Sequence, residues 1–461
     1  MPPKVMIGLE IHGYLDIPSK TKLFCTCSLE PSDPNTQICP ICTGQPGSKP
    51  MLPNREAIDA ILRIALFLEC SINPELLFQR KHYSWPDLPN GYQKTMSGAY
   101  SQPVGLNGKF LGVGIEEIHL EEDPARWDPV SGGVDYNRSG YPLVEIVTKP
   151  EFDSANHAKE WLEHLMVALS YIKAVRRDLG VKCDVNVSVA PDFVRTEVKN
   201  VNSFSSIHAA ILHEIERQNA EKREERKQQT RAWDDASNTT KFMRSKETAL
   251  DYMFIPDPDL PVIVVTDELL TPIKAKLPER PDQKEMKFFK AGVPGEVAHK
   301  LSTNLYFANA AEAVAKHNID ISFIANRFIN EIAGLVGDAY ETVAQIDVTL
   351  LAHAMQAFSS RQVTNTEFKS IVEHLIKGKL PEAKAMLTHA SASKQDDSAL
   401  APLVADAIAA NPVAVADVKK GNDKAINAIV GHVIKALKAN GKSADPAVIQ
   451  KVVRNALGEQ S

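Results

Sequence analysis

The hydrophobic pattern of the chain changes near residue 295, and this change limits the folds that it can adopt. Before that point, short runs alternate apolar and polar residues, as in Lys182–Val189, with the period of two that is typical of half-buried strands. After it, Ala, Lys, Glu and Leu dominate, a composition that favours helices. We therefore expect an α+β domain with a mainly antiparallel sheet, followed by all-α domains.

A few segments of the first part have helical spacing. Arg55–Glu69 carries an apolar stripe, Ser154 is placed to cap a second helix, and Ile207–Ile215 marks a third. In the C-terminal part, the small polar segment Ala390–Ala399 is expected to be a loop or linker.

Length and composition restrict the class of protein. At 461 residues the chain is too long for one ordinary core, so we expect two to four domains. No run of eighteen apolar residues is present, which argues against a membrane span. Met1–Leu9 resembles neither a signal peptide nor a transit peptide. These features predict a cytoplasmic protein, or an organellar one if a leader has been removed.

Charge is distributed unevenly. The net charge is −6, yet residues 401–461 contain eight Lys and Arg against five Asp and Glu. A basic tail on an acidic body would allow contact with a nucleic acid through the tail. A solvated helix surface would show the same balance.

Four of the six cysteines are clustered as Cys25-x-Cys27 and Cys39-x-x-Cys42. Such clustering in a cytosolic protein indicates a metal site rather than disulfides. Four thiolates form a closed tetrahedral site that suits zinc and leaves no position for a substrate. The alternative is a small core of four free thiols.

Two acidic segments are candidates for binding a divalent cation. On a strand, Glu10 and His12 share the face opposite Ile11, and His119–Asp123 contains three consecutive carboxylates. Carboxylate oxygens are the ligands that Mg²⁺ prefers beside nucleotide phosphates. An exposed strand face and a charged turn would give the same two patterns.

Cations among hydrogen-bonding side chains occur at Arg80–Tyr83, Asp135–Arg138 and Glu197–Phe204. Phosphoryl transfer needs such cations, although ordinary surface turns have the same composition. The chain has no P-loop pattern, so any ATP site must belong to another class.

Taken in order, these segments resemble one family, the GatB subunits of Asp/Glu-tRNA amidotransferases. The matching segments are Ile7–His12, Thr21–Cys27, Cys39–Pro46, Phe78–Tyr83, Trp85–Gln93, His119–Asp123, Val134–Val147, Cys183–Val189, Val198–Phe204, Thr230–Asp234, Met243–Glu247, Pro256–Pro261 and Gly441–Val448. Each segment is weak alone, but their common order is highly specific.

The resemblance implies three domains and a reaction. Residues 1–292 would form a cradle-like domain of the glutamine-synthetase class, 293–398 a helical domain and 399–461 a YqeY-like tail that binds tRNA. The family uses Mg²⁺-ATP to phosphorylate the side-chain carboxylate of glutamate or aspartate esterified to tRNA(Gln) or tRNA(Asn). Ammonia then displaces the phosphate. It comes from a GatA-like glutaminase, and a GatC-like small subunit joins the two.

The resemblance also suggests roles for individual residues. The residues expected to act in the chemistry are Glu10, His12, Glu122, Lys81, Asn137, Arg138, Lys199 and Asn200. The residues expected to bind Mg²⁺ are Glu10, His12, Glu121 or Glu122, and more weakly Asp184. The residues expected to contact tRNA are Lys419, Lys420, Lys424, Lys435 and Lys442.

The position of Glu122 raises a conflict. On a regular strand Glu121 shares the face of His119, whereas Glu122 lies on the opposite face with Leu120. Either a bulge turns Glu122 towards the metal or Glu121 is the ligand, and both remain open.

Three other interpretations compete with this one. The archaeal GatE paralogue carries a large inserted domain, for which about thirty residues after Pro261 leave no room. A non-catalytic tRNA-binding protein with a zinc knuckle would have acidic clusters that are only solvated surface. A ligase for free amino acids would act without tRNA. Asn90, where the family often has lysine, makes a role there in an ammonia tunnel doubtful.

Overall fold

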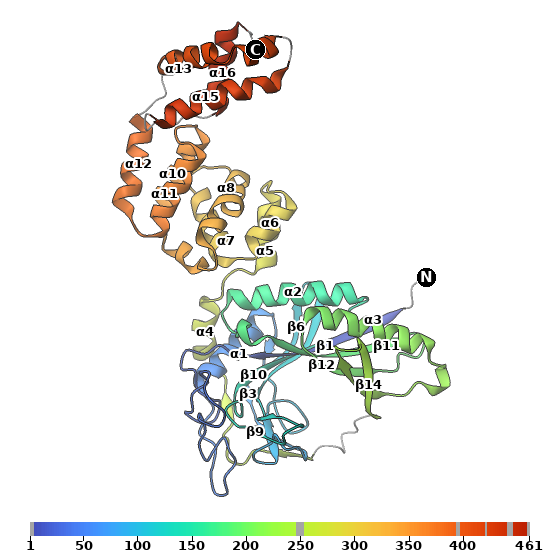
Figure 1. Ribbon diagram of the computed structural model, residues 1–461. Coiled ribbons are helices and arrows are strands. Elements are labelled where there is room, and N and C mark those ends of the chain that lie inside the picture. Colours follow the sequence, from blue (N-terminus) through green and yellow to red (C-terminus); the bar gives the residue numbers. More distant parts are fainter. Residues whose placement is uncertain (1–3, 246–252, 393–396, 420–421, 440–445, 459–461) are drawn as a thin grey trace. The chain divides into compact units, whose positions relative to one another are not determined.

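The computed structural model describes residues 4–245, 253–392, 397–419, 422–439 and 446–458, which form two compact units, residues 1–280 and 281–461 (Figure 1). The boundary lies before the position 292 expected from the sequence. Within the second unit, one hydrophobic cluster extends from Phe288 to Ala383 and another from Leu400 to Val453. These clusters support a further division of the second unit, which stays a prediction.

The first unit is built on a mixed, mostly antiparallel sheet of twelve strands. Its main path runs β14-β13-β12-β11-β1-β10-β7-β5-β4-β15, and off this path β6 pairs with β7 and β2 pairs with β6. The bounds are β1 Val5–Tyr14, β2 Ser71–Ile72, β4 Gln79–His82, β5 Tyr92–Thr95, β6 Gly105–Phe110, β7 Val113–Glu122, β10 Pro142–Thr148, β11 Val181–Val189, β12 Thr196–Val201, β13 Gln229–Asp234, β14 Thr239–Ser245 and β15 Met253–Pro256. Two small pairs stand apart: β3 Glu75–Leu76 with β16 Ile263–Val264, and β8 Arg126–Trp127 with β9 Val134–Asp135.

Each helix predicted in this unit is present. Asn54 caps α1 (Arg55–Phe67) through the amide of Glu56, and Ser154 caps α2 (Ala155–Tyr171) through that of His157. The third, α3, spans Phe204–Ala220, and α4 spans Asp267–Ala275. Figure 1 shows α2 and α3 along one face of the sheet; α3 packs on β11, and alternate apolar residues of β1 and β11 are buried.

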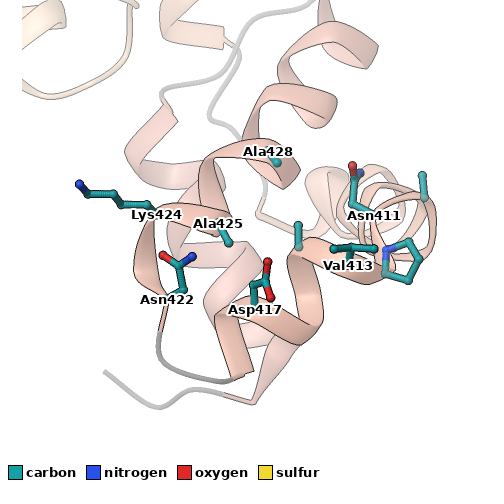
Figure 2. Close-up of a pocket in the computed structure, with 10 residues that line it drawn as sticks. Asn411, Val413, Asp417, Asn422, Lys424, Ala425 and Ala428 are labelled. Carbon is teal, nitrogen blue, oxygen red and sulfur yellow. The ribbon is translucent and has the colours of Figure 1, made fainter.

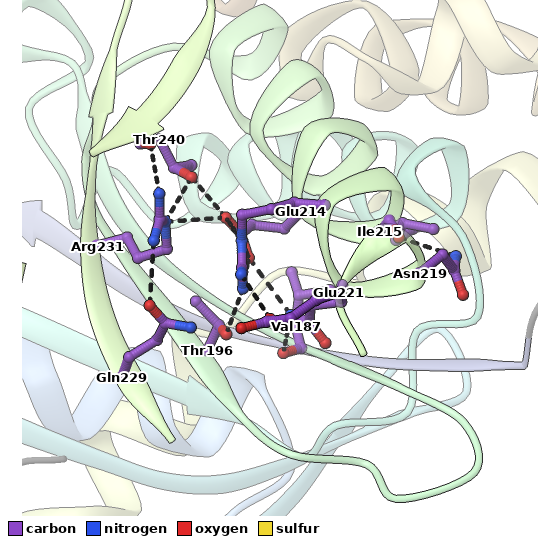
Figure 3. Close-up of polar contacts among 11 residues, drawn as sticks. Val187, Thr196, Glu214, Ile215, Asn219, Glu221, Gln229, Arg231 and Thr240 are labelled. Carbon is purple, nitrogen blue, oxygen red and sulfur yellow. Dashed lines mark hydrogen bonds and ion pairs between the residues drawn. The ribbon is translucent and has the colours of Figure 1, made fainter. Parts of the chain in front are cut away.

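A buried carboxylate fastens α3 to the edge of the sheet (Figure 3). Glu214, fully buried on α3, accepts hydrogen bonds from Arg217 at 3.0 Å and from Thr240 on β14, and lies 3.4 Å from Arg231 on β13. Burial alone would raise the pKa of Glu214, but the hydrogen bonds from Arg217 and Thr240 hold it below its ordinary value. Helix and edge strands are therefore joined by charge as well as by apolar packing.

The second unit is helical throughout the part that the structure describes. Its elements are α5 Pro281–Lys290, α6 Gly295–Ser302, α7 Leu305–Ala315, α8 Ile321–Arg327, the π-turn η3 Phe328–Ile332, α9 Ala333–Val336, the 3-10 turn η4 Tyr340–Gln345, α10 Val348–Ser359, α11 Asn365–Ile376, α12 Leu380–Ala392, α13 Asp397–Ala410, α14 Pro412–Lys419, the 3-10 turn η5 Asp423–Ala425, α15 Ile426–Ala439 and α16 Pro446–Leu457.

The expected linker Ala390–Ala399 is largely wrong. Residues 390–392 end α12 and residues 397–399 begin α13, while 393–396 lie outside the described residues. Alanine favours a helix strongly, and it outweighs the polarity of the neighbouring Ser and Asp. Among the described helices none alone has the length and apolarity to cross a membrane, although the bent pair Leu400–Ala410 and Pro412–Val418 meets both criteria together.

Candidate active site

The candidate site lies on the polar face of the large sheet, opposite α2 and α3. The alternation of β1 buries Ile7, Leu9 and Ile11 on the helix side and turns Glu10 and His12 to the other side, as their spacing predicts.

Antiparallel register then sets the neighbours of these two residues. Glu10 lies opposite Asp184 on β11, and His12 lies opposite Glu145 on β10. Glu145 in turn faces His119 on β7. A polar row thus crosses four adjacent strands whose opposite face is apolar.

The first cluster on this face, which we call the imidazole group, comprises His12, Glu121 and Glu145. Their candidate ligand atoms lie within 4.8 Å of one another. His12 Nε2 is 3.3 Å from Glu145 Oε2 and 3.8 Å from Glu121 Oε1. His119 Nε2 reaches the same oxygen of Glu145 at 2.8 Å.

Charges in the imidazole group are strongly coupled. Burial would raise the pKa of Glu145, but the imidazoles of His12 and His119 hold it well below its ordinary value. Burial also opposes charge on His12, yet Glu145 raises the pKa of His12 to about 9. Burial and repulsion from Glu145 raise the pKa of Glu121. The carboxylates require positive charge beside them, which a bound divalent cation would supply.

The second cluster, the carboxylate group, comprises Glu10, Asp184 and Glu197, again with ligand atoms within 4.8 Å of one another. Asn186 donates to Glu10 at 2.9 Å. Lys199 bridges the other two acids, at 2.9 Å from Asp184 and 2.7 Å from Glu197. An all-oxygen set suits Mg²⁺, whereas the imidazole group offers a mixed nitrogen and oxygen set. Glu10 and His12, expected to share one ion, thus belong to separate clusters.

The structure places Glu121 and Glu122 on opposite faces of β7, and which of the two binds a metal stays a prediction. From Glu117 to Glu122 the pairing of β7 with β10 is regular, so Glu121 stays on the face of His119 and joins the imidazole group. Glu122 instead accepts hydrogen bonds from the ammonium of the buried Lys94, at 2.9 and 3.1 Å, and from its amide. The positive charge of Lys81, on β4, acts on Glu121.

Arg138, Asn137 and Asn200, also expected to act in the chemistry, are placed differently from one another. Arg138 pairs with the buried Asp123 at 3.0 Å and donates to the carbonyls of residues 124 and 125. Asn137 is turned towards the cysteine segment, where it donates to the Asp33 carbonyl and accepts from the Gln37 amide. Asn200 is exposed at a φ of 67°.

The four clustered cysteines converge as the spacing predicts. The Sγ atoms of Cys25, Cys27, Cys39 and Cys42 lie within 4.8 Å of one another, and those of Cys39 and Cys42 are 3.9 Å apart. Ligands about 2.3 Å from a tetrahedral zinc would be roughly 3.8 Å apart, so the donor set fits this ion. A hydrogen bond from Cys25, assisted by Lys22, lowers the pKa of the Cys42 thiol to about 4.

The cysteine segment is tied to the loop before β10. Lys22, almost fully buried, reaches Cys42 Sγ at 3.2 Å and the Tyr136 carbonyl at 2.9 Å. Ser139 donates to the Cys42 carbonyl at 2.8 Å.

Sequence reasoning missed two candidate ligands, Glu145 and Glu197. Glu145 was detectable, because it is the single charged residue in the apolar strand 142–148. Glu197 gave no comparable signal. It lies beside Asp184 because of the pairing of β11 with β12, and a bulge between Cys183 and Val185 shifts the register of that pairing.

In the tail, residues of α13, α14, η5 and α15 line an open surface pocket of about 600 Å³ (Figure 2). Its lining includes Asn411, Asp417, Asn422 and Lys424. Of the lysines expected to contact tRNA, Lys424 and Lys435 are exposed. The side chain of Lys419, and Lys420 and Lys442, lie outside the described residues.

Comparison with known proteins identifies the family. Residues 5–271 match the model of the GatB/GatE catalytic domain, and residues 307–457 match that of the GatB domain. The aspartyl/glutamyl-tRNA(Asn/Gln) amidotransferase B subunits of Methanopyrus kandleri and Methanocaldococcus jannaschii are each 38% identical to the chain, over 98% of both sequences. That of Methanococcus aeolicus is 39% identical, over 94% of this chain and 95% of its own. The chain belongs to the GatB family of amidotransferase B subunits.

Proposed function

We propose that the chain is the component of a tRNA-dependent amidotransferase that activates the side-chain carboxylate of glutamyl-tRNA(Gln) or aspartyl-tRNA(Asn). Family membership supports the overall reaction, which yields Gln-tRNA(Gln) or Asn-tRNA(Asn). The observation that carries the proposal is the pair of clusters on one sheet face, the imidazole group and the carboxylate group. A GatA-like glutaminase and a GatC-like small subunit would complete the enzyme in the cytoplasm.

Activation is needed because a carboxylate has no adequate leaving group. One carboxylate oxygen forms a bond to the γ-phosphorus of ATP while the bond from phosphorus to the β–γ bridging oxygen breaks, and ADP leaves with that electron pair. The lone pair of ammonia then attacks the carbonyl carbon. The bond from carbon to the phosphate oxygen breaks, and the phosphate takes up the proton that nitrogen loses.

The polar face offers what this chemistry requires. Bound Mg²⁺ would offset the charge that spreads over the phosphoryl oxygens. The carboxylate group would hold it through Glu10 and Asp184, with the imidazole group as the adjoining cation site. Lys199 limits the negative charge between Asp184 and Glu197, and Arg138 keeps Asp123 and the carbonyls behind it in place.

The test uses this chain co-purified with its amidase and small partners. ADP release is followed with Mg²⁺-ATP, ammonium and glutamyl-tRNA, and then with free glutamate. We expect release only with the charged tRNA, together with a glutaminyl-tRNA product. Equal release with free glutamate would indicate a ligase for free amino acids. Tight tRNA binding by the assembled complex without any ADP release would indicate a binding protein.

The paralogue GatE is a weaker candidate. The catalytic-domain model covers GatB and GatE together, but the match to the GatB domain extends through the helical part. Between Pro261 and α5 the structure has only β16 and α4.

A further inference from the structure

The cations around the candidate site differ in how far their positive charge is already neutralised by carboxylates. Lys94 is bound by Glu122, Lys199 by Asp184 and Glu197, and Arg138 by Asp123. Each of these cations has a carboxylate within 3.0 Å. Their positive charge is largely neutralised by ion pairs that hold the site together. An incoming anion would have to compete with an existing ion pair.

Lys182 differs from these three cations, because its ammonium is not paired with a carboxylate in the part of the chain that the structure describes. It is exposed on β11, lies opposite His12 and shares the face of Asp184. Its hydrogen-bond partner among the described residues is the neutral hydroxyl of Tyr14, at 3.4 Å.

The contact with Tyr14 also sets the direction of this ammonium. Tyr14 shares the face of His12, and its hydroxyl donates to Asp123 at 3.0 Å. Because that proton is committed to Asp123, the hydroxyl oxygen faces Lys182 as an acceptor. Asp123 is itself held by Arg138. One of the three ammonium protons is thus engaged, and two remain beside the imidazole group.

We propose that Lys182 binds the γ-phosphoryl group of the nucleotide during its transfer, an inference that rests on the proposed function. A compact ammonium with two uncommitted protons matches an oxygen-rich dianion. Placed beside His12, it would meet the phosphoryl oxygens from the side of β11. Lys182 would interact with the phosphate that moves, and the paired cations would maintain the geometry around it.

The test compares Lys182→Met and Lys182→Arg in the assembled complex, with Lys109→Met, an exposed lysine on β6, as the control. For Lys182→Met we expect kcat for tRNA-dependent ADP release to fall roughly 100-fold, the effect of losing one preorganised donor. Lys182→Arg should recover at least about tenfold of this loss, since it keeps the charge. The control should behave like the unchanged chain.

A binding measurement separates a phosphate contact from a structural role. Lys182→Met should weaken ATP binding by roughly tenfold and leave ADP binding within about twofold, because only ATP carries the γ-phosphate. Equally weakened binding of ATP and ADP, or turnover within twofold of the unchanged chain, would overturn the role of Lys182 and leave the proposed function untouched. If the unchanged complex released no ADP with charged tRNA, the proposed function would fail as well.

Discussion

At the scale of single residues, Oε2 of Glu145 lies between two imidazoles of the candidate site. It lies 2.8 Å from His119 and 3.3 Å from His12, and both imidazoles stabilise its charge. Spacing alone indicated that Glu10 and His12 share a face. It did not indicate Glu145, because a partner on another strand is defined by register, and register depends on pairings far apart in sequence.

Glu121 and Glu122 provide a matched pair for testing the metal assignment. Glu121→Gln should lower tRNA-dependent ADP release by roughly 100-fold, because it removes a charge next to His12. Glu122→Gln should keep most of the turnover but lower the free energy of unfolding by about 3 kcal/mol, since the buried Lys94 loses its ionic partner. Turnover and urea denaturation of both variants check these values. If Glu122→Gln were the inactive variant while remaining folded, the ligand would be Glu122.

At the scale of elements, local signals predicted the strands and helices well where one face is apolar. The strand Lys182–Val189 and the helix capped by Ser154 are both present. The linker predicted at 390–399 was wrong for residues 390–392 and 397–399, because their polar side chains do not prevent helices rich in alanine.

The buried Glu214 is expected to stabilise the junction of α3 with β13 and β14. Glu214→Ala should lower the free energy of unfolding by about 3 kcal/mol, because the buried network loses the carboxylate to which Arg217 and Thr240 donate. Glu216→Ala, at an exposed position of the same helix, is the control and should change it by less than about 0.5 kcal/mol. Thermal and urea unfolding provide the measurement, and equal effects of the two changes would contradict this role.

The same network predicts a pH dependence. The pKa of Glu214 is lower in the folded chain than its ordinary value. The contribution of the ionised Glu214 to the free energy of unfolding is therefore fully present above its pKa in the unfolded chain, about 4.3. This contribution is lost as the pH falls through its lower pKa in the folded chain. The difference in unfolding free energy between the unchanged chain and Glu214→Ala should shrink below about pH 4.

The cysteine segment should depend on metal for its stability. Cys39→Ser, or removal of zinc by a chelator, should lower the melting temperature by several degrees before it affects nucleotide binding. Cys70→Ser is the control for loss of a thiol outside the quartet. A melting temperature and zinc content that are unchanged by Cys39→Ser would exclude a structural zinc.

At the scale of the whole molecule, the two clusters of candidate ligands on the sheet lie in the first unit, and the exposed tail lysines Lys424 and Lys435 lie in the second. The change of pattern near residue 295 predicted an α+β part before a helical one, which the fold confirms. The placement of the polar side chains depends on the pairing of β12, β11, β1, β10 and β7, which no local pattern contains.

Ending the chain before α13 (Asp397–Ala410) should weaken binding of the charged tRNA by at least about tenfold and reduce its dependence on salt, because basic side chains are removed. The melting temperature of the remaining part should not change, since the tail has its own hydrophobic cluster. Fluorescence anisotropy at two salt concentrations measures the effect. An unchanged dissociation constant would refute a role of the tail in binding.

The central position of β1 has a consequence for how such a protein can vary. The strand pairs with β10 on one side and β11 on the other, and through these pairings it aligns both clusters. Inserting or deleting one residue in β1 would exchange its buried and polar faces. Chemistry and folding would then fail together, so insertions and deletions that change substrate preference have to lie in the loops, where they leave the strand register intact.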